Sequence, residues 1–237
     1  MLILAIDCAT PAAGVAIIQD ETLLIEDFIN NKKKHSERFM ATIDRVLKEC
    51  DITLSEVDVL ACSLGPGSFT GLRIGLATVK GLCLATEKPV IGISTLDMLA
   101  ENIYCSQPTL VSPLLNARKN EVYTAFYLSG GGNTRISEDL ACSPLEFTFR
   151  ARELTREHGL EEIILLGDGY NPYRELYQNE LGPMAKEAPI HLMLPRAAAL
   201  GNLARKRAIA GDYDDIWALR PHYLRLSEAE YRLAEGN

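Results

Sequence analysis

Short apolar runs alternate with helical periodicity along the whole chain. In the first half, β-branched and leucine-rich runs predict strands, and apolar residues spaced three and four apart predict the helices between them. The predicted elements of this half are strands 2–6, 14–19 and 22–28, helix 35–50, strand 57–63, helix 68–87, strand 90–93 and helix 94–103. Their order is β-β-β-α-β-α-β-α.

The second half repeats this order. Its predicted elements are strands 110–115, 122–128 and 135–141, helix 143–157, strand 163–166, helix 173–181, a short strand 189–191 and helix 196–210. A supersecondary unit repeated at a period of roughly 110 residues predicts a duplicated α/β fold with two lobes, the actin-like ATPase (ASKHA) fold. We place the boundary at the polar break Ser106-Gln107-Pro108, so that the N-terminal lobe is 1–105 and the C-terminal lobe is 106–237.

Composition and charge narrow the class of protein. The 237 residues are 47% hydrophobic and 24% charged, and the formal net charge is −8. A chain that grips nucleic acid by itself usually has a basic surplus, so an independent nucleic-acid binder is not expected. No apolar run approaches the ~18 residues of a membrane span, and the run before Asp7 is too short for a signal peptide. We therefore expect a cytoplasmic protein with no membrane contact.

Neither the cysteines nor the histidines predict a special site. The six cysteines are scattered through apolar segments without a C-x-x-C pair, which favours buried thiols over disulfides. The four histidines lack the H-x-x-x-H and H-E-x-x-H spacings that place two metal ligands on one helix face. No metal site is expected.

Asp7 is the first candidate for chemistry, because it ends the first predicted strand. A carboxylate there could hold hydrated magnesium against nucleotide phosphates, or it could cap the turn that follows. The corresponding position of the second repeat is Asn116, which carries no charge to position a metal–phosphate unit. Nucleotide turnover is therefore not expected.

The glycine-rich run from Gly65 to Gly75 lies between a predicted strand and a predicted helix. It lacks the G-K-[ST] ending of a Walker A loop, and its third glycine falls one residue too late for G-x-G-x-x-G. One interpretation is a weak ATP or ADP phosphate site. The other is close packing of the helix on the sheet, with Ser68 or Thr70 as the helix cap. The residues that could contact phosphate are Asp7, Thr10, Gly65, Gly67 and Ser68.

The helix after this run is apolar nearly all round. From Thr70 to Ala85 its only charged residues are Arg73 and Lys80. Such a helix is buried on more than one side, and only one side can meet the sheet. Small residues recur four apart, at Gly71/Gly75 and at Ala77/Gly81/Ala85, which would let another helix approach closely. The second surface could belong to a partner, to helix 35–50 or to the other lobe.

Several short motifs stand in order along the chain. They are Leu4-Ala5-Ile6-Asp7, His35-Ser36-Glu37, Gly65–Gly75, Asn116-Ala117-Arg118 with Glu121-Val122-Tyr123, and Pro221-His222-Tyr223-Leu224-Arg225. Together they resemble the bacterial TsaB (YeaZ-like) family of the tRNA threonylcarbamoyladenosine machinery. The resemblance covers essentially the whole chain and implies the two-lobed actin-like fold, with tRNA contacted only indirectly through a complex. Asn116 departs from the family's Asp-Ala-Arg pattern, which weakens any ligand role of that position.

The resemblance implies a non-catalytic, activating subunit for threonylcarbamoyl transfer to the adenosine beside the anticodon of ANN-decoding tRNAs. The catalytic paralogue TsaD carries two histidines four apart on the first helix, whereas this chain has His35 followed by Phe39. The implied partners are a TsaD-like paralogue and a TsaE-like ATPase, with a homodimer when the chain is alone. The implied interface residues are His35, Phe39, Met40, Ile43, Gly71, Leu72, Gly75, Leu76, Val79 and Leu82.

The alternative function is a nucleotide-binding small-molecule kinase or ATPase that uses Asp7 and the cleft between the lobes. A metallopeptidase is a third possibility, and the absent histidine pair argues against it.

Overall fold

The computed structural model describes residues 1–30 and 39–225, and it divides the chain into two compact units. The first unit comprises Met1–Asn102 and Pro195–His222, and the second comprises Ile103–Leu194 and, of the described residues that follow, 223–225. The break after Asn102 lies close to the predicted boundary after residue 105. The expectation that everything after this break forms the second lobe is wrong, because Pro195–His222 returns to the first unit.

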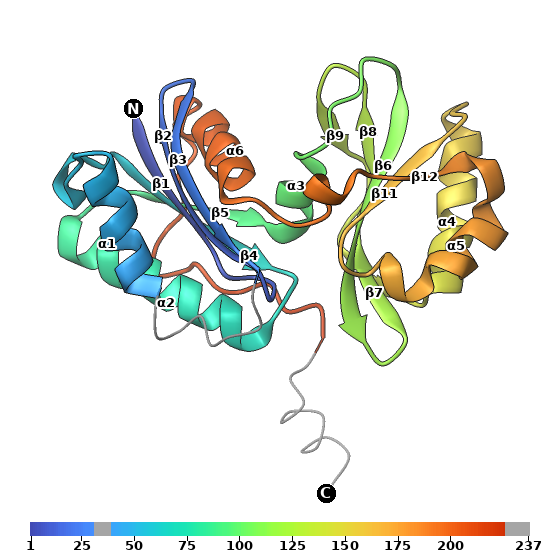
Figure 1. The fold of residues 1–237 in the computed structure, drawn as a ribbon, viewed down its shortest axis with the longest axis horizontal. Coiled ribbons are helices and arrows are strands. Elements are labelled where there is room, and N and C mark those ends of the chain that lie inside the picture. The colour runs from blue at the N-terminus through green and yellow to red at the C-terminus, as the bar shows by residue number, and fades with distance from the viewer. Residues whose placement is uncertain (31–38, 226–237) are drawn as a thin grey trace, which may run out of the picture. The chain divides into compact units, whose positions relative to one another are not determined.

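The first unit is a five-stranded sheet with helices on both faces (Figure 1). The strand order is β3-β2-β1-β4-β5, in which β1 pairs antiparallel with β2 and parallel with β4. The strands are β1 (Leu2–Asp7), β2 (Ala13–Gln19), β3 (Thr22–Ile29), β4 (Val59–Gly65) and β5 (Val90–Ser94). The helices are α1 (Phe39–Glu49), α2 (Phe69–Thr86), α3 (Thr95–Ala100) and α6 (Ala197–Ile209), with a 3-10 turn at Leu54–Glu56.

Alternating side chains of β1 explain the two helical layers. Leu4 and Ile6 join a core with buried residues of α1 and α2, whereas Ile3 and Ala5 join a second core with α6 and with Met98 of α3. Because successive side chains of a strand point to opposite faces, β1, which is apolar from Leu2 to Ile6, needs cover on both faces.

The returning segment also belongs to the first unit. Asp214 forms a bridge to Val90 at the start of β5, and the His222 N–H donates to the Leu64 carbonyl at 2.7 Å. Leu219 is buried in the core beneath α1 and α2. The segment is therefore anchored beside the residues that precede α2 and those that follow it.

The second unit contains a seven-stranded sheet whose main path is β10-β7-β6-β11-β12. Two further strands extend it, because β8 pairs with β6 and β9 pairs with β8. The strands are β6 (Thr109–Arg118), β7 (Glu121–Thr124), β8 (Tyr127–Ser129), β9 (Asn133–Arg135), β10 (Leu140–Cys142), β11 (Ile163–Leu166) and β12 (Ala185–Glu187). The helices are α4 (Pro144–Glu157) and α5 (Arg174–Leu181), with 3-10 turns at Asn171–Tyr173, Gly182–Met184 and Ile190–Leu192.

The two main sheet paths confirm the predicted duplication. In both, the first strand is central, the second and third follow antiparallel on one side, and the fourth and fifth follow parallel on the other. α1 and α4 precede the fourth strand, and α2 and α5 join the fourth strand to the fifth.

Three predictions in the second half are wrong. Residues 122–128 form two strands, because β7 and β8 pair with different halves of the long strand β6. Residues 135–141 likewise divide between β9 and β10, and residues 189–191 fall at a 3-10 turn while the last strand is β12. Each error depends on which strands pair with one another in the sheet, and local periodicity does not predict that pairing.

All six cysteines are free thiols; four are buried, and Cys50 and Cys105 are half-buried. Among the described residues, no helix has the length and apolarity required to cross a membrane.

Candidate functional site

The glycine-rich run packs directly against the loop that follows β1. A Cβ atom on Gly67 would lie 2.2 Å from the Ala9 carbonyl oxygen, and one on Gly71 would lie 2.0 Å from the Cys8 carbonyl oxygen. The Ser68 N–H donates to the Ala9 carbonyl at 2.6 Å. Ser68 is also the N-cap of α2, since its Oγ accepts the Gly71 N–H. The packing interpretation is confirmed, because these two positions leave no room for a side chain.

The polar groups that could contact phosphate make hydrogen bonds within the chain. Asp7 is only 1% exposed, and its Oδ1 accepts the Ala9 N–H at 2.9 Å. Burial raises the pKa of the Asp7 carboxyl, and the hydrogen bonds from Ser63 and the backbone oppose that rise. The Thr10 hydroxyl accepts the Ala12 N–H at 3.2 Å. The structure therefore brings Asp7, Thr10, Gly67 and Ser68 together in a densely packed region. We call this contact between the glycine-rich run and the loop after β1 the glycine junction.

The position in the second unit that matches Asp7 has a different chemistry and lies inside β6, which continues to Arg118. Asn116 is exposed, and its backbone N–H donates to Asp168 Oδ1 at 3.0 Å. Asp168 follows β11, and burial raises the pKa of its carboxyl. Sequence reasoning found Asn116 and missed Asp168, although Gly167-Asp168-Gly169 after a predicted strand is a recognisable turn signal.

No cluster for a metal ion is present in the part of the chain that the structure describes. No group of three or more His, Cys, Asp or Glu side chains has suitable geometry among residues 1–30 and 39–225. His35 and the His35-Ser36-Glu37 motif lie outside these residues, so their placement is not described.

Most of the predicted interface side chains lie inside the first unit. The side chains of this set that are buried in the core beneath α1 and α2 are Phe39, Ile43, Leu76 and Val79. Leu72 is also buried, and Gly75 packs against Cys8. These side chains face the core because the sheet takes the most apolar face of each helix, and their role in a partner interface stays a prediction.

The exposed face of α2 is different and is also poor in charge. Its exposed residues are Thr70, Arg73, Ala77, Gly81, Leu84 and Ala85. Leu84 is 54% exposed, and nothing lies within 4 Å of the position that a Cβ on Gly81 would take. We call Ala77, Gly81, Leu84 and Ala85 the α2 outer face. The four-residue spacing of small residues in the sequence indicates three of these residues, Ala77, Gly81 and Ala85. Only their exposure in the structure distinguishes them from the buried residues of α2.

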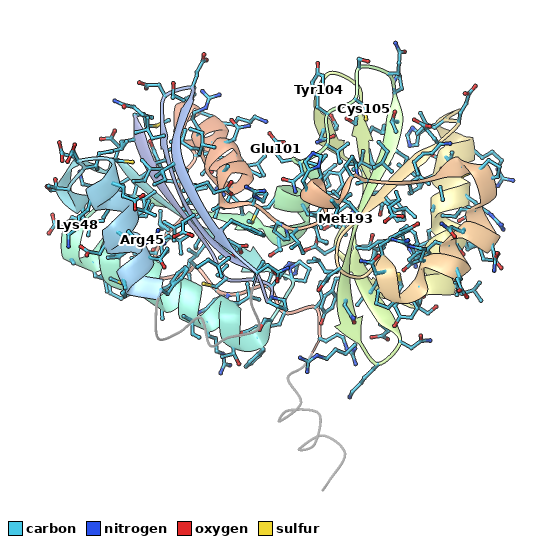
Figure 2. The ribbon with its side chains drawn as sticks, in the orientation of Figure 1. Arg45, Lys48, Glu101, Tyr104, Cys105 and Met193 are labelled. Carbon is cyan, nitrogen blue, oxygen red and sulfur yellow. The ribbon has the colours of Figure 1, made fainter. Side chains whose placement is uncertain are left out.

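Other exposed or half-buried side chains lie on α2 and on α1. Arg73 of α2 stacks over the Phe69 ring, with its guanidinium carbon 3.9 Å from the ring centroid. Gly71 and Leu82 of α2 are half-buried. On α1, Met40 is 54% exposed, and Figure 2 shows Arg45 and Lys48 further along the same helix. Arg45 pairs with Asp27 of β3, and Lys48 pairs with Asp44 at 2.7 Å.

The chain is similar to proteins of known family along its full length. Residues 23–233 match the family model described as TsaD, tRNA N6-adenosine threonylcarbamoyltransferase. The tRNA threonylcarbamoyladenosine biosynthesis protein TsaB of Escherichia coli is 30% identical, with 98% of each chain covered. The TsaB of Bacillus subtilis is 29% identical, with 100% of this chain and 99% of the relative covered.

Solved structures agree with this assignment. YeaZ from Pseudomonas aeruginosa has a TM-score of 0.76 at 27% identity, covering 94% of this chain and 99% of that one. A 2-hydroxyisocaproyl-CoA dehydratase activator from Clostridium difficile has a TM-score of 0.53 at 9% identity, covering 89% of this chain and 97% of that one. This second likeness shows the shared actin-like fold alone. The duplicated sheets, the glycine junction and the full-length matches together establish that this chain belongs to the TsaB (YeaZ) family of tRNA threonylcarbamoyladenosine biosynthesis proteins.

Proposed function

We propose that this chain is a non-catalytic, activating subunit in the synthesis of threonylcarbamoyladenosine on ANN-decoding tRNAs. It docks the α2 outer face on a homologous catalytic chain of the TsaD type and stabilises the active conformation of that chain. The observation that carries the proposal is the exposed, nearly uncharged face of α2. The proposal agrees with the biosynthetic role in the names of its full-length relatives.

The shape of the α2 outer face favours a helix as its partner. Ala77, Gly81 and Ala85 are small and four apart, so the backbone of a second helix can approach closely. Leu84 then supplies an exposed apolar side chain beside them. A homologous partner of the same fold has a helix equivalent to α2, which would pack on the α2 outer face. A second copy of this chain offers the same helix, which accounts for a homodimer when the chain is alone.

The absence of catalysis by this chain is part of the proposal. The Asp7 carboxylate and the Ser68 N–H already have hydrogen-bond partners within the first unit, which disfavours a phosphate site there. The net charge of −8 disfavours a surface that grips tRNA. We therefore assign catalysis and tRNA contact to the TsaD-like partner, ATP hydrolysis to a TsaE-like ATPase, and no resident cofactor to this chain.

The decisive experiment compares two leucine substitutions of similar exposure. Leu84→Glu changes the α2 outer face, and Leu145→Glu changes an exposed position on α4, where Leu145 is 58% exposed. We expect Leu84→Glu to weaken binding to the TsaD-like partner by about 100-fold or more, because a carboxylate would be buried unpaired. Calorimetric titration measures the affinity of the two chains. Mass spectrometry of tRNA from a reconstituted modification reaction measures the threonylcarbamoyladenosine formed.

The matched variant and circular dichroism exclude unfolding as the cause. Leu145→Glu is expected to keep native affinity and full nucleoside formation. Native affinity in Leu84→Glu, or equal losses in both variants, would contradict the docking assignment. Steady ATP turnover by the pure chain that disappears in Asp7→Ala would instead support the kinase or ATPase alternative.

A further inference from the structure

A cavity lies in the second unit where its sheet divides. The first part of β6 pairs with β8, and the later part pairs with β7, so the chain crosses between them at Ala125 and Phe126. The chain crosses again between β9 and β10. The cavity of about 430 Å³ is lined by residues of these crossings and of α4. This volume is in the range of small-ligand pockets.

The wall of the cavity is apolar and rigidly held. Phe126, Leu140 and Leu154 form it, and Phe126 stacks on Phe147 with ring centroids 5.5 Å apart and planes 2° apart. Phe147 in turn meets Tyr177 edge to face at 5.4 Å. The backbone at this point is satisfied, since the Phe126 N–H donates to Ser137 Oγ and the Phe126 carbonyl accepts the Ile136 N–H, both at 2.9 Å.

The mouth of the cavity carries charges of both signs, all from α4. Arg150 is already paired with Glu146 at 2.8 Å. Within residues 1–30 and 39–225, Glu153, Arg156 and Glu157 line the cavity without forming an ion pair. A guanidinium and two carboxylates are thus available to a ligand beside an apolar wall.

We propose that this cavity binds a free α-amino acid with a large apolar or aromatic side chain. The side chain packs on Phe126, Leu140 and Leu154, the carboxylate pairs with Arg156, and the ammonium pairs with Glu153 or Glu157. A ligand with only a carboxylate would leave the Glu153 and Glu157 carboxylates without a partner and would lie near their like charge. A ligand with only an ammonium group would do the same with Arg156. The cavity is formed entirely by the second unit, so this site is separate from the α2 outer face.

The test is an NMR titration of the full chain with L-phenylalanine. Phenylacetate lacks the ammonium and phenethylamine lacks the carboxylate, so these two probes test each charge separately. We expect saturable shifts of the backbone amides at Phe126, Ser137 and Leu140, and at least tenfold weaker binding of either analogue. Arg156→Ala is expected to weaken L-phenylalanine binding about tenfold, which corresponds to about 1.4 kcal/mol.

Arg152→Ala is the matched control, because Arg152 lies on the same helix but pairs with Glu180 at 3.5 Å instead of lining the cavity. Its affinity for L-phenylalanine should equal that of the unchanged chain. The proposal is overturned if the shifts do not saturate, if all three probes bind equally, or if Arg156→Ala binds as the unchanged chain does. Binding of N-acetyl-phenylalanine amide with the same affinity as L-phenylalanine would also overturn the proposal. This compound lacks both charges, so that result would indicate a ligand that is a peptide segment and not a free amino acid.

Discussion

The helices α2 and α5 occupy the same place in the two halves of the duplication, yet their outer faces differ. Each joins the fourth strand of its sheet to the fifth. The exposed residues of α5 are Arg174, Glu175, Gln178 and Asn179, all polar, whereas those of α2 include one charge among small and apolar residues. Packing on a sheet constrains only the inner face of a helix, so the outer face is free to follow function. The contrast supports the proposal that α2, and not the duplicated topology as such, provides the partner surface.

The turns at the ends of the fourth strands, β4 and β11, have the same backbone conformation in both units. Gly65 has φ +108° and Gly167 has φ +114°. A Cβ on Gly167 would lie 2.0 Å from the Leu114 carbonyl oxygen, and one on Gly65 would lie 2.8 Å from that of His222. Both positions require glycine for its left-handed backbone and for lack of space. The polar residues nearby differ, with buried Asp7 in one unit and exposed Asn116 in the other.

The largest expected effect separates the two faces of α2. Leu76 is 7% exposed and lies in the core, so Leu76→Glu should lower the free energy of unfolding by at least about 3 kcal/mol. Urea denaturation of the isolated chain measures this. Leu84→Glu should change the same quantity by less than about 0.5 kcal/mol while losing the partner. If Leu76→Glu unfolds at the native urea midpoint, the division of α2 into a core face and an outer face is wrong.

The next effect compares two glycines of α2. Gly71→Ala should cost at least about 2 kcal/mol, because the added methyl overlaps the Cys8 carbonyl oxygen. Gly81→Ala should instead stabilise the isolated chain by about 0.5–1 kcal/mol, because alanine favours the helix and the space is open. Thermal unfolding of the two variants checks the sign of each change. A stabilising Gly71→Ala would refute the close packing of the glycine junction.

The smallest expected effect concerns Asp7, the buried carboxylate at the end of β1. Because burial raises the pKa of Asp7, the folded chain favours the protonated form more than the unfolded chain does. This contribution is fully present below the ordinary carboxyl pKa and is lost as the pH rises through the folded-state pKa.

Asp7→Asn keeps an oxygen for the Ala9 N–H and removes the titration. The unfolding free energy of the unchanged chain, relative to that of Asp7→Asn, should therefore fall as the pH rises above the ordinary carboxyl pKa. Denaturant unfolding at several pH values measures the difference. A constant difference over this rise in pH would show that Asp7 does not titrate as its burial requires.

Much of the fold could be predicted because it depends on local periodicity. Residue type and spacing alone predict the apolar run of β1, a helix cap at Ser68 or Thr70 and the glycine turn after β4, and the structure places the cap at Ser68. The split of residues 122–128 could not be predicted, since it depends on β6 being long enough to pair with two strands. The return of Pro195–His222 to the first unit is likewise a contact between distant segments.

The same division holds for the candidate site. The sequence by itself determined that α2 is apolar nearly all round and needs a second surface, because that property belongs to the residues of one helix. Only the tertiary structure decided that Leu76 and Val79 face the core and that Gly81 and Leu84 face outward. The physical reason is that helical periodicity shows which residues share a face, whereas the sheet that packs against the helix selects which face is buried.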